Sequence, residues 1–499
     1  MGDFLIKRPM LLAALLASAI SIVGIYIESA LFLIFVLLPI VFFILVYKKA
    51  KGEIIVCFAV VFAVVLSLVF TTRSVTELEK FDGCDCAGEF VVLEEPVNHG
   101  DYYSVNIETI YSETLKSGTK LNAVFYKGEL EVSQKIKANI FVEGMKNYKL
   151  KYSFYSSGIY LKGRIKSFEY IGEREFVLHK LDGFKNYIKE TIFEFYGKRE
   201  SATMLALLSG DRSYFSNQFY ANVKNSGVAH VMVVSGMHLS IIVSLFLYLI
   251  NKVLYNRYLK AVVIFAATLL VAAVCGFTMS ILRAGITYLF LALSLVLKRE
   301  NTPENTLGCA VCTVLIMNPF AIMNVAFQLS VLSTFAILVV AVPISLYIEE
   351  RKLIKNRFIL TIIVAVITSL SALIFTAPTT TYIFGYISNV SVITNLLITF
   401  AVTFGLILCI LGLLIPFLRP ILFGLSNLAI SYINWVIDYF GNLSFSTTDT
   451  SKIVSLFMVV VIIAILWILV ACKKHKDVLK LKEIRAKKHK ERGVKGKCR

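Results

Sequence analysis

The chain has 499 residues, of which 57% are hydrophobic and only 17% are charged, and its formal net charge is +18. Soluble proteins carry about 25% charged residues, so this composition excludes an ordinary soluble protein. Apolar runs of about 20 residues, long enough to cross a hydrocarbon core of about 30 Å, recur along the chain. The sequence therefore predicts a polytopic α-helical membrane protein with about 12 spans and one inserted, small all-β extracytoplasmic domain.

Residues 1–70 predict three amino-terminal transmembrane helices. An apolar run extends from Met10 to Val46, with a break at Glu28. We interpret this run as a helical hairpin and not as a signal peptide, because a further span follows at Ile54–Phe70 and no convincing cleavage site is present. Lysines between the second and third spans place the amino terminus in the cytoplasm.

Residues 71–180 differ in character and predict the all-β domain. Runs in which apolar and polar residues alternate are typical of half-buried strands, and five of them occur at the spacing of a small barrel or sandwich. Five strands in about a hundred residues suit an OB-fold. The strands are expected at Glu89–Leu93, Tyr103–Ile107, Leu121–Phe125, Ala138–Val142 and Tyr160–Ile165.

Basic and aromatic side chains interleave in the second half of this domain. Cations that neutralise phosphates, together with rings on which bases stack, are what a single nucleic-acid strand requires. The alternative interpretation is a solvated β surface over aromatic core residues. The residues expected to guide a strand are Lys135, Lys137, Lys149, Lys151, Lys162, Arg164 and Lys166, with Tyr148, Tyr152, Phe154, Tyr155 and Tyr160 between them.

Residues 181–229 predict amphipathic interfacial helices that return the chain to the membrane. Residues 230–472 predict nine further spans, beginning with His230–Ile250, and residues 473–499 form a basic tail that suits anionic lipid or, alternatively, nucleic acid. All basic loops fall on one side in this arrangement, so both termini are expected in the cytoplasm. Segments 306–318 and 378–388 are short or broken and fit either a span or a re-entrant segment.

Polar residues within the apolar spans are the strongest functional signal. Each costs free energy in lipid unless it is paired, or faces water or a partner helix. Hydrogen bonding between helices explains any single member, but a set spread over several spans favours a polar path. His230 and His238 are expected on one side of a single helix, about 80° apart. The predicted path consists of His230, Ser235, Gly236, His238, Arg283, Gln328, Ser330, Asn389 and Asn395.

Motifs for nucleotide, cofactor or metal binding are missing from the sequence. It contains no Walker A sequence, no Gly-x-Gly-x-x-Gly and no His-Glu-x-x-His. We therefore expect no cofactor, no metal and no enzymatic activity. Ser235 and His238 raise an intramembrane serine protease as a rival. That rival is weaker, because no Gly-x-Ser-Gly loop surrounds the serine and both residues share one local segment.

Several motifs, in order along the chain, resemble the competence domain of the ComEC family of bacterial DNA-uptake channels. The central one, Gly227–His238, contains the pattern His-x4-Ser-Gly-x-His. The region Phe154–Tyr160 resembles the end of the family's amino-terminal domain. The remaining matches are Leu208–Arg212, Ser280–Ala284, Asn318–Pro319 with Phe327–Ser330, and Pro378 through Tyr382 and Phe384 to Asn389 and Asn395.

The resemblance implies a channel in the bacterial cytoplasmic membrane that imports single-stranded DNA during natural transformation. It implies an extracytoplasmic DNA receptor, a cytoplasmic ATP-driven motor and a separate nuclease as partners. Many members also carry a carboxy-terminal metallo-β-lactamase-like domain with His-x-His-x-Asp-His. This sequence lacks that motif, so we expect no nuclease activity from it. The alternative class is a transporter of small solutes or lipid-linked substrates.

Overall fold

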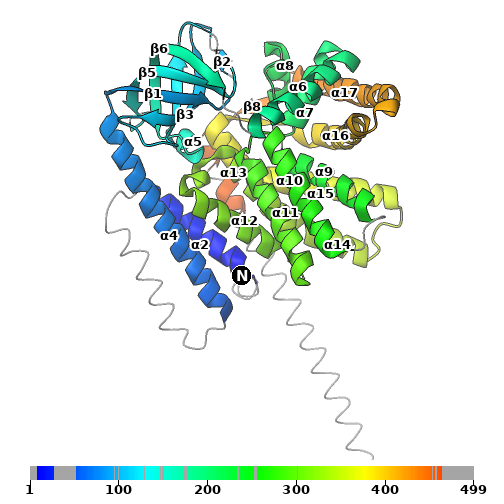
Figure 1. The fold of residues 1–499 in the computed structure, drawn as a ribbon. Helices are drawn as coiled ribbons and strands as arrows, with labels where there is room; N and C mark the ends of the chain where they lie inside the picture. The colour runs from blue at the N-terminus through cyan, green and yellow to red at the C-terminus, as the bar shows by residue number, and fades with distance from the viewer. Residues whose placement is uncertain are drawn as a thin grey trace, which may run out of the picture.

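The computed structural model shows a β domain beside a larger body of helices (Figure 1). Three predicted features lie outside the residues that the structure describes: the span ending at Val46, the basic tail and Lys149. The described residues are 8–26, 52–94, 96–98, 100–128, 130–146, 148, 151–173, 177–232, 235–251, 256–300, 302–451, 453–455 and 458–462.

Five strands of the β domain close a ring. The first strand, β1, pairs with both β3 and β5, and the order around the ring is β1-β3-β4-β6-β5. Only β4 and β6 run parallel, and inward side chains such as Phe90, Ile107 and Ile140 are fully buried. The five predicted strands are confirmed. The bounds are β1 (Asp85–Val92), β2 (Val97–Asn98), β3 (Tyr103–Ser112), β4 (Lys120–Phe125), β5 (Gln134–Gly144) and β6 (Leu161–Glu173).

Seven helices among the described residues are long and apolar enough to cross a bilayer, and shorter apolar helices accompany them. These features agree with a polytopic helical membrane protein, while the count of about 12 spans stays a prediction. The long helices are α4 (Gly52–Leu78), α10 (Arg257–Val274), α11 (Met279–Leu297), α13 (Val325–Ala336) continued by η3 (Ile337–Ala341) and α14 (Val342–Glu350), α15 (Arg357–Phe384), α16 (Ser391–Leu414) and α17 (Arg419–Gly441). The shorter ones are α2 (Pro9–Tyr26), α9 (Gly236–Asn251), α12 (Pro303–Met317) and the segment Ile453–Ile462.

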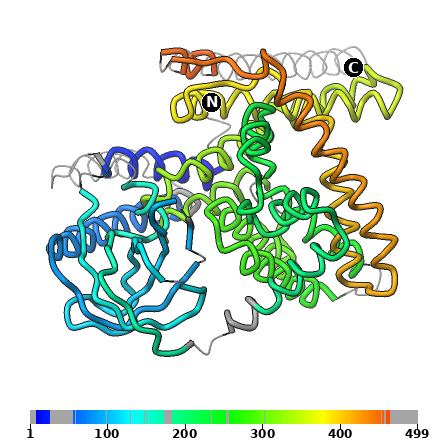
Figure 2. The backbone as a smooth tube through the Cα atoms, turned by 90° about the horizontal axis from the view of Figure 1, so that it is seen from above, coloured from blue at the N-terminus to red at the C-terminus, as the bar shows by residue number. Residues whose placement is uncertain are grey.

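The remaining elements are short or polar. Seen from above, the β domain lies on one side of the molecule and most of the helical body on the other (Figure 2). These elements are η1 (Glu79–Phe81), α5 (Lys151–Ser156), α6 (Val177–Phe195), α7 (Lys198–Ser209), α8 (Asn217–Asn225), η2 (Pro319–Met323), β7 (Tyr386–Ser388), η4 (Pro416–Leu418) and β8 (Thr447–Asp449).

Two helices are longer than predicted. The third helix, α4, does not end with its apolar run but continues to Leu78, and hydroxyls within residues 71–76 donate to carbonyls one turn earlier. Likewise, α15 runs through Pro378 to Phe384 without a break. Pro378 removes the backbone donor that would bond to the carbonyl of Ile374, and the Thr381 hydroxyl donates to the carbonyl of Ala377 at 2.8 Å in the following turn.

The expectation of interfacial helices for residues 181–229 is wrong for α7. Residues 201–208 of this helix are all buried, and α7 packs against α6, α16 and α17. Its polar side chains have partners on α17: the Thr203 hydroxyl donates to Asn434 Oδ1 at 2.7 Å, and Glu200 accepts from Ser431 at 3.1 Å. These bonds make burial possible for a helix whose polar residues suggest a surface position.

The β domain is fixed to the membrane helices through α5 and η2. Asn318 Nδ2 donates to the carbonyls of Tyr155 and Ser156 at 2.8 and 2.9 Å. The ring of Phe320 lies 5.2 Å from that of Tyr155 and stacks on Tyr152 at 6.3 Å. The aromatic residues that interleave with lysines therefore pack into this contact, as the core interpretation expects, and do not form a free stacking platform.

We predict that Gly308→Ala destabilises the helical body. A Cβ at this α12 position would overlap the backbone carbonyl of Met10 on α2, and overpacking of this kind costs about 1–3 kcal/mol. Thermal unfolding in detergent should show a lower midpoint for this variant. The matched control is Gly424→Ala on α17, where nothing lies within 4 Å of the added Cβ. Equal midpoints for the two variants would contradict the α2–α12 packing.

Candidate functional site

The turn between α8 and α9 is clamped against β7 and α16. Gly227 has a φ of 76°, a value that favours glycine, and a Cβ there would lie 2.6 Å from Ser388 Oγ. The Ser388 hydroxyl donates to the carbonyl of Asn225 at 2.8 Å, and the Thr394 hydroxyl donates to that of Ser226 at 2.9 Å. Both the backbone and the available space therefore require glycine at position 227.

The helix α9 begins at Gly236, so His230 lies in the preceding turn and not on a span. The expectation that His230 and His238 share one helical face is wrong. The physical reason is a local cap: the hydroxyl oxygen of Ser235 accepts the backbone N–H of Met237 at 3.3 Å, so the helix starts at Gly236, six residues later than predicted.

His230 nevertheless contacts the membrane helices. Its Nε2 lies 3.4 Å from Nδ2 of Asn395 on α16. The side chain keeps exposed surface although many protein atoms lie around it. Desolvation by these surroundings lowers the pKa of His230, while a hydrogen bond with the backbone of Gly227 raises it.

His238 is fully buried in the first turn of α9 and has one ring nitrogen without a partner. Its Nδ1 accepts the backbone N–H of Ser235 at 3.1 Å, which assigns the proton of the neutral ring to Nε2. This Nε2 has no hydrogen-bond partner among the described residues. An unsatisfied buried donor costs about 1–3 kcal/mol, so an acceptor bound there would be stabilising.

The geometry of Ser235 and His238 does not form a nucleophile–base pair. The Ser235 hydroxyl oxygen caps the helix, and the His238 Nδ1 faces the backbone of Ser235 and not its hydroxyl. A serine nucleophile requires its hydroxyl to donate to the imidazole. The arrangement therefore gives no support to the protease alternative.

Arg283 on α11 is a buried cation, 7% exposed, and it has no carboxylate partner among the described residues. Its Nε donates to Ser330 Oγ of α13 at 2.7 Å, and Ser280 Oγ lies 3.3 Å from the same oxygen. A Cβ on Gly236 would lie 3.0 Å from Arg283 Nη2, so α9 and α11 touch here. The terminal Nη atoms make no hydrogen bond with the described residues. We call Gly236, Ser280, Arg283 and Ser330 the arginine cluster.

Two predicted site residues are engaged elsewhere. The side-chain amide of Gln328 donates to the carbonyl of Ile322 at 2.8 Å, next to the contact with the β domain. The amide of Asn389 donates to the Phe445 carbonyl and to the Thr448 hydroxyl, both at 2.8 Å, and joins β7 to the segment around β8. The structure therefore gives both residues connecting roles and does not bring them to the arginine cluster.

Several of the predicted guiding cations are already paired. Arg164 forms an ion pair with Glu143 at 3.5 Å, and Lys166 forms one with Asp85. Lys162 lies over the ring of Tyr148, 3.8 Å from its centroid, and Lys151 lies 5.1 Å from that of Tyr152. On the described part of the chain, the cations of this set without an ion pair or ring contact are Lys135 and Lys137.

The sequence-based site omitted Ser280 and Thr394, although both take part. Ser280 lies three residues before Arg283, so it shares a helical face with the cation. Thr394 is similarly next to Asn395 and fixes the turn before His230. The sequence spacing of Ser280 from Arg283 and of Thr394 from Asn395 was the one pattern that could have predicted their role. Hydroxyls within apolar helices usually bond to their own backbone, however, so their presence alone does not indicate a site.

We predict that the Arg283–Ser330 contact is energetically coupled. Ser330→Ala leaves the buried Nε without its acceptor and should cost about 1–3 kcal/mol, whereas the same change in an Arg283→Met background should cost little. Thermal unfolding of the four proteins measures this coupling. Ser333→Ala is the control, since that hydroxyl donates only to a carbonyl of its own helix. An identical cost of Ser330→Ala in both backgrounds would refute the contact.

Comparison with known proteins gives several relatives. The chain is 29% identical over 184 residues to the uncharacterized protein MG316 homolog of Mycoplasma pneumoniae, covering 37% of this chain and 44% of that protein. It is 27% identical over 215 residues to uncharacterized protein MG316 of Mycoplasma genitalium, covering 43% and 51%. ComE operon protein 3 of Bacillus subtilis is 24% identical over 331 residues, covering 64% and 40%. The chain thus spans about half or less of these relatives.

No solved structure matches the chain significantly. A family model described as competence protein matches residues 207–475, which is more than half of the chain. The match includes the turn around Gly227, the arginine cluster and α16, and therefore every element that positions the candidate site. This chain belongs to the competence protein family.

Proposed function

We propose that this protein is a membrane channel that imports single-stranded DNA across the cytoplasmic membrane during natural transformation. One observation carries the proposal: the guanidinium of Arg283, buried where α9 meets α11, has no carboxylate partner among the described residues. His238 on α9 adds a buried Nε2 that has no acceptor among the same residues. A phosphodiester supplies the missing partner, because it is an anion whose oxygens only accept hydrogen bonds. Membership of the competence family supports the same ligand.

The single hydrogen bond between Arg283 and Ser330 suits weak, reversible binding of a ligand that passes through the channel. This bond from Nε orients the guanidinium, and the Nη atoms remain for the ligand. A single cation in a neutral polar surrounding attracts a phosphate without trapping it, and conduction requires such weak binding. His230 and Asn395 extend the same polar surface towards the turn at Gly227.

We propose that the contact between α9 and α11 closes the channel in this structure. The α-carbon of Gly236 lies against Arg283 and Ala284, so a strand passes only after the two helices separate. Glycine at this position keeps the guanidinium within reach of both helices. The arginine cluster is therefore proposed to act as a gate and as a phosphate contact.

For the β domain we propose an OB-type barrel that lies outside the cell and receives the strand. A closed five-stranded ring with one parallel pair supports this assignment. Lys135 and Lys137 are the best candidates for guiding phosphates, because the other described cations of the set have partners. Both termini are proposed to lie in the cytoplasm, with about 12 spans in total.

The partners are likewise proposals. A DNA receptor outside the membrane delivers the DNA and a separate nuclease leaves one strand. Because the sequence has no Walker A motif, a cytoplasmic ATP-driven motor is proposed to supply the driving force. The lipid bilayer contacts the apolar helices and, through its anionic lipids, the basic tail.

We predict that Arg283→Gln lowers DNA uptake while Arg283→Lys largely preserves it. Glutamine retains a donor for Ser330 but removes the charge, and one charged hydrogen bond is worth about 1.5–3 kcal/mol, which corresponds to about a tenfold or larger loss of uptake. The measurement is the amount of end-labelled DNA that becomes resistant to external nuclease in a competent host lacking its own channel gene.

Immunoblots of membrane fractions provide the control, because all variants must be present at equal levels. Uptake by Arg283→Gln equal to that of the wild type would contradict the role of the cation. If the wild-type chain fails to restore uptake at all, the transporter alternative for small solutes or lipid-linked substrates gains support instead.

A further inference from the structure

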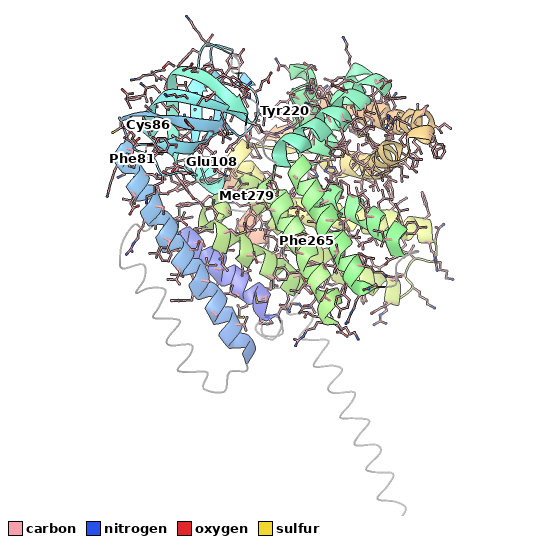
Figure 3. All side chains as sticks on the ribbon, in the orientation of Figure 1. Phe81, Cys86, Glu108, Tyr220, Phe265 and Met279 are labelled. Atoms are coloured by element: carbon pink, nitrogen blue, oxygen red, sulfur yellow. The ribbon has the colours of Figure 1, made fainter. Side chains whose placement is uncertain are left out.

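An aromatic and basic surface lies where α8 approaches β7. Tyr220 and Lys224 are one turn apart on α8, and the ammonium of Lys224 lies 4.5 Å from the Tyr220 ring centroid. Tyr220 is 39% exposed, and in the view of Figure 3 it lies between α8 and the β domain. The buried face of α8 uses other residues, so this pair is not needed for packing of the helix.

Two further rings complete this surface. Phe384, at the end of α15, is 53% exposed, and its ring centroid lies 6.2 Å from that of Tyr386. Burial raises the pKa of Tyr386, and the neighbouring Tyr220 phenol raises it further, so the two tyrosines are close. We call Tyr220, Lys224, Phe384 and Tyr386 the collar.

The collar lies next to the turn that leads to the candidate site. Tyr386 and Ser388 are on the same short strand, and Ser388 donates to the carbonyl of Asn225 at the end of α8. The turn at Gly227 follows directly, and it leads to His230. The rings and the polar surface are therefore continuous along the chain and through these contacts.

The chemistry of the collar fits a nucleic-acid strand. Aromatic faces stack with bases of any sequence, and a lysine neutralises phosphate. Lys224 forms no ion pair with a carboxylate of the described residues, so its charge is available. Tyrosine and lysine also occur at bilayer interfaces, and liposome insertion of a Tyr220 variant distinguishes that role from DNA binding.

We propose that the collar binds single-stranded DNA by stacking bases on Tyr220 and Tyr386 while Lys224 contacts a phosphate. This inference rests on the proposed channel function and names a binding site that precedes the arginine cluster. The stacked bases are exchanged one after another as the strand advances, since stacking does not depend on sequence.

The test uses the full-length protein in detergent and two fluorescent probes of equal length, oligo-dT and an abasic strand. Tyr220→Leu should weaken oligo-dT binding by about fivefold or more and leave the abasic strand unaffected, because only bases stack. Tyr220→Phe retains the ring and should bind as the wild type does. Lys224→Gln should weaken both probes and reduce the salt dependence by about one phosphate contact.

The matched control is Tyr258→Leu, since Tyr258 is 53% exposed and has Arg257 at 4.9 Å from its ring, but lies on α10. If the wild type binds oligo-dT and Tyr220→Leu binds it equally well, the collar is refuted and the channel proposal survives. If Tyr220→Leu changes only insertion into liposomes, the collar is a bilayer contact and the proposal fails. A wild type that binds neither strand overturns the channel proposal as well.

Discussion

The burial of Arg283 is the constraint on which the candidate site depends. A guanidinium inside a helical body requires compensation, and here Ser330 accepts from its Nε while no carboxylate of the part of the chain that the structure describes neutralises it. A structural ion pair would leave little affinity for a ligand. The uncompensated charge, together with the unpartnered Nε2 of His238, instead makes an anion the natural complement. Gly236 allows α9 to approach this cation closely, since a Cβ there would lie 3.0 Å from Arg283 Nη2.

Other parts of the molecule hold this cluster in place. The turn at Gly227 is bonded to β7 and α16, which fixes His230 in front of α9. The buried helix α7 is bonded to α17, and η2 attaches the β domain to α13 through Asn318 and Phe320. The β domain and the arginine cluster are thus connected through a short and well-packed route, since Ser330 lies on the helix that follows η2.

Much of this fold follows from patterns in the sequence, and the failures have physical causes. Alternation revealed all five barrel strands, because each strand buries only one face. Hydropathy located the apolar helices but misplaced the start of α9. The apolar run continues through a turn at Gly227 and a capping Ser235, and hydropathy does not detect either feature. Amphipathic composition suggested that α7 lies at the membrane interface. The sequence does not reveal that its polar side chains are bonded inside the protein, because their partners are distant along the chain. Gln328 and Asn389 also resembled path residues, although the amide of Gln328 bonds to the nearby Ile322 carbonyl and that of Asn389 bonds to the distant Phe445 carbonyl and Thr448 hydroxyl.

The central claim, that a DNA strand passes the arginine cluster, is tested most directly by cross-linking a strand trapped during uptake. A strand carrying 4-thiothymidine and a bulky trailing end stops in the channel, and mass spectrometry identifies the peptides joined to it. We predict adducts on α9, α11 and α16 near Arg283. Adducts confined to the β domain and to exposed faces such as that of Phe265 on α10 would contradict the claim (Figure 3).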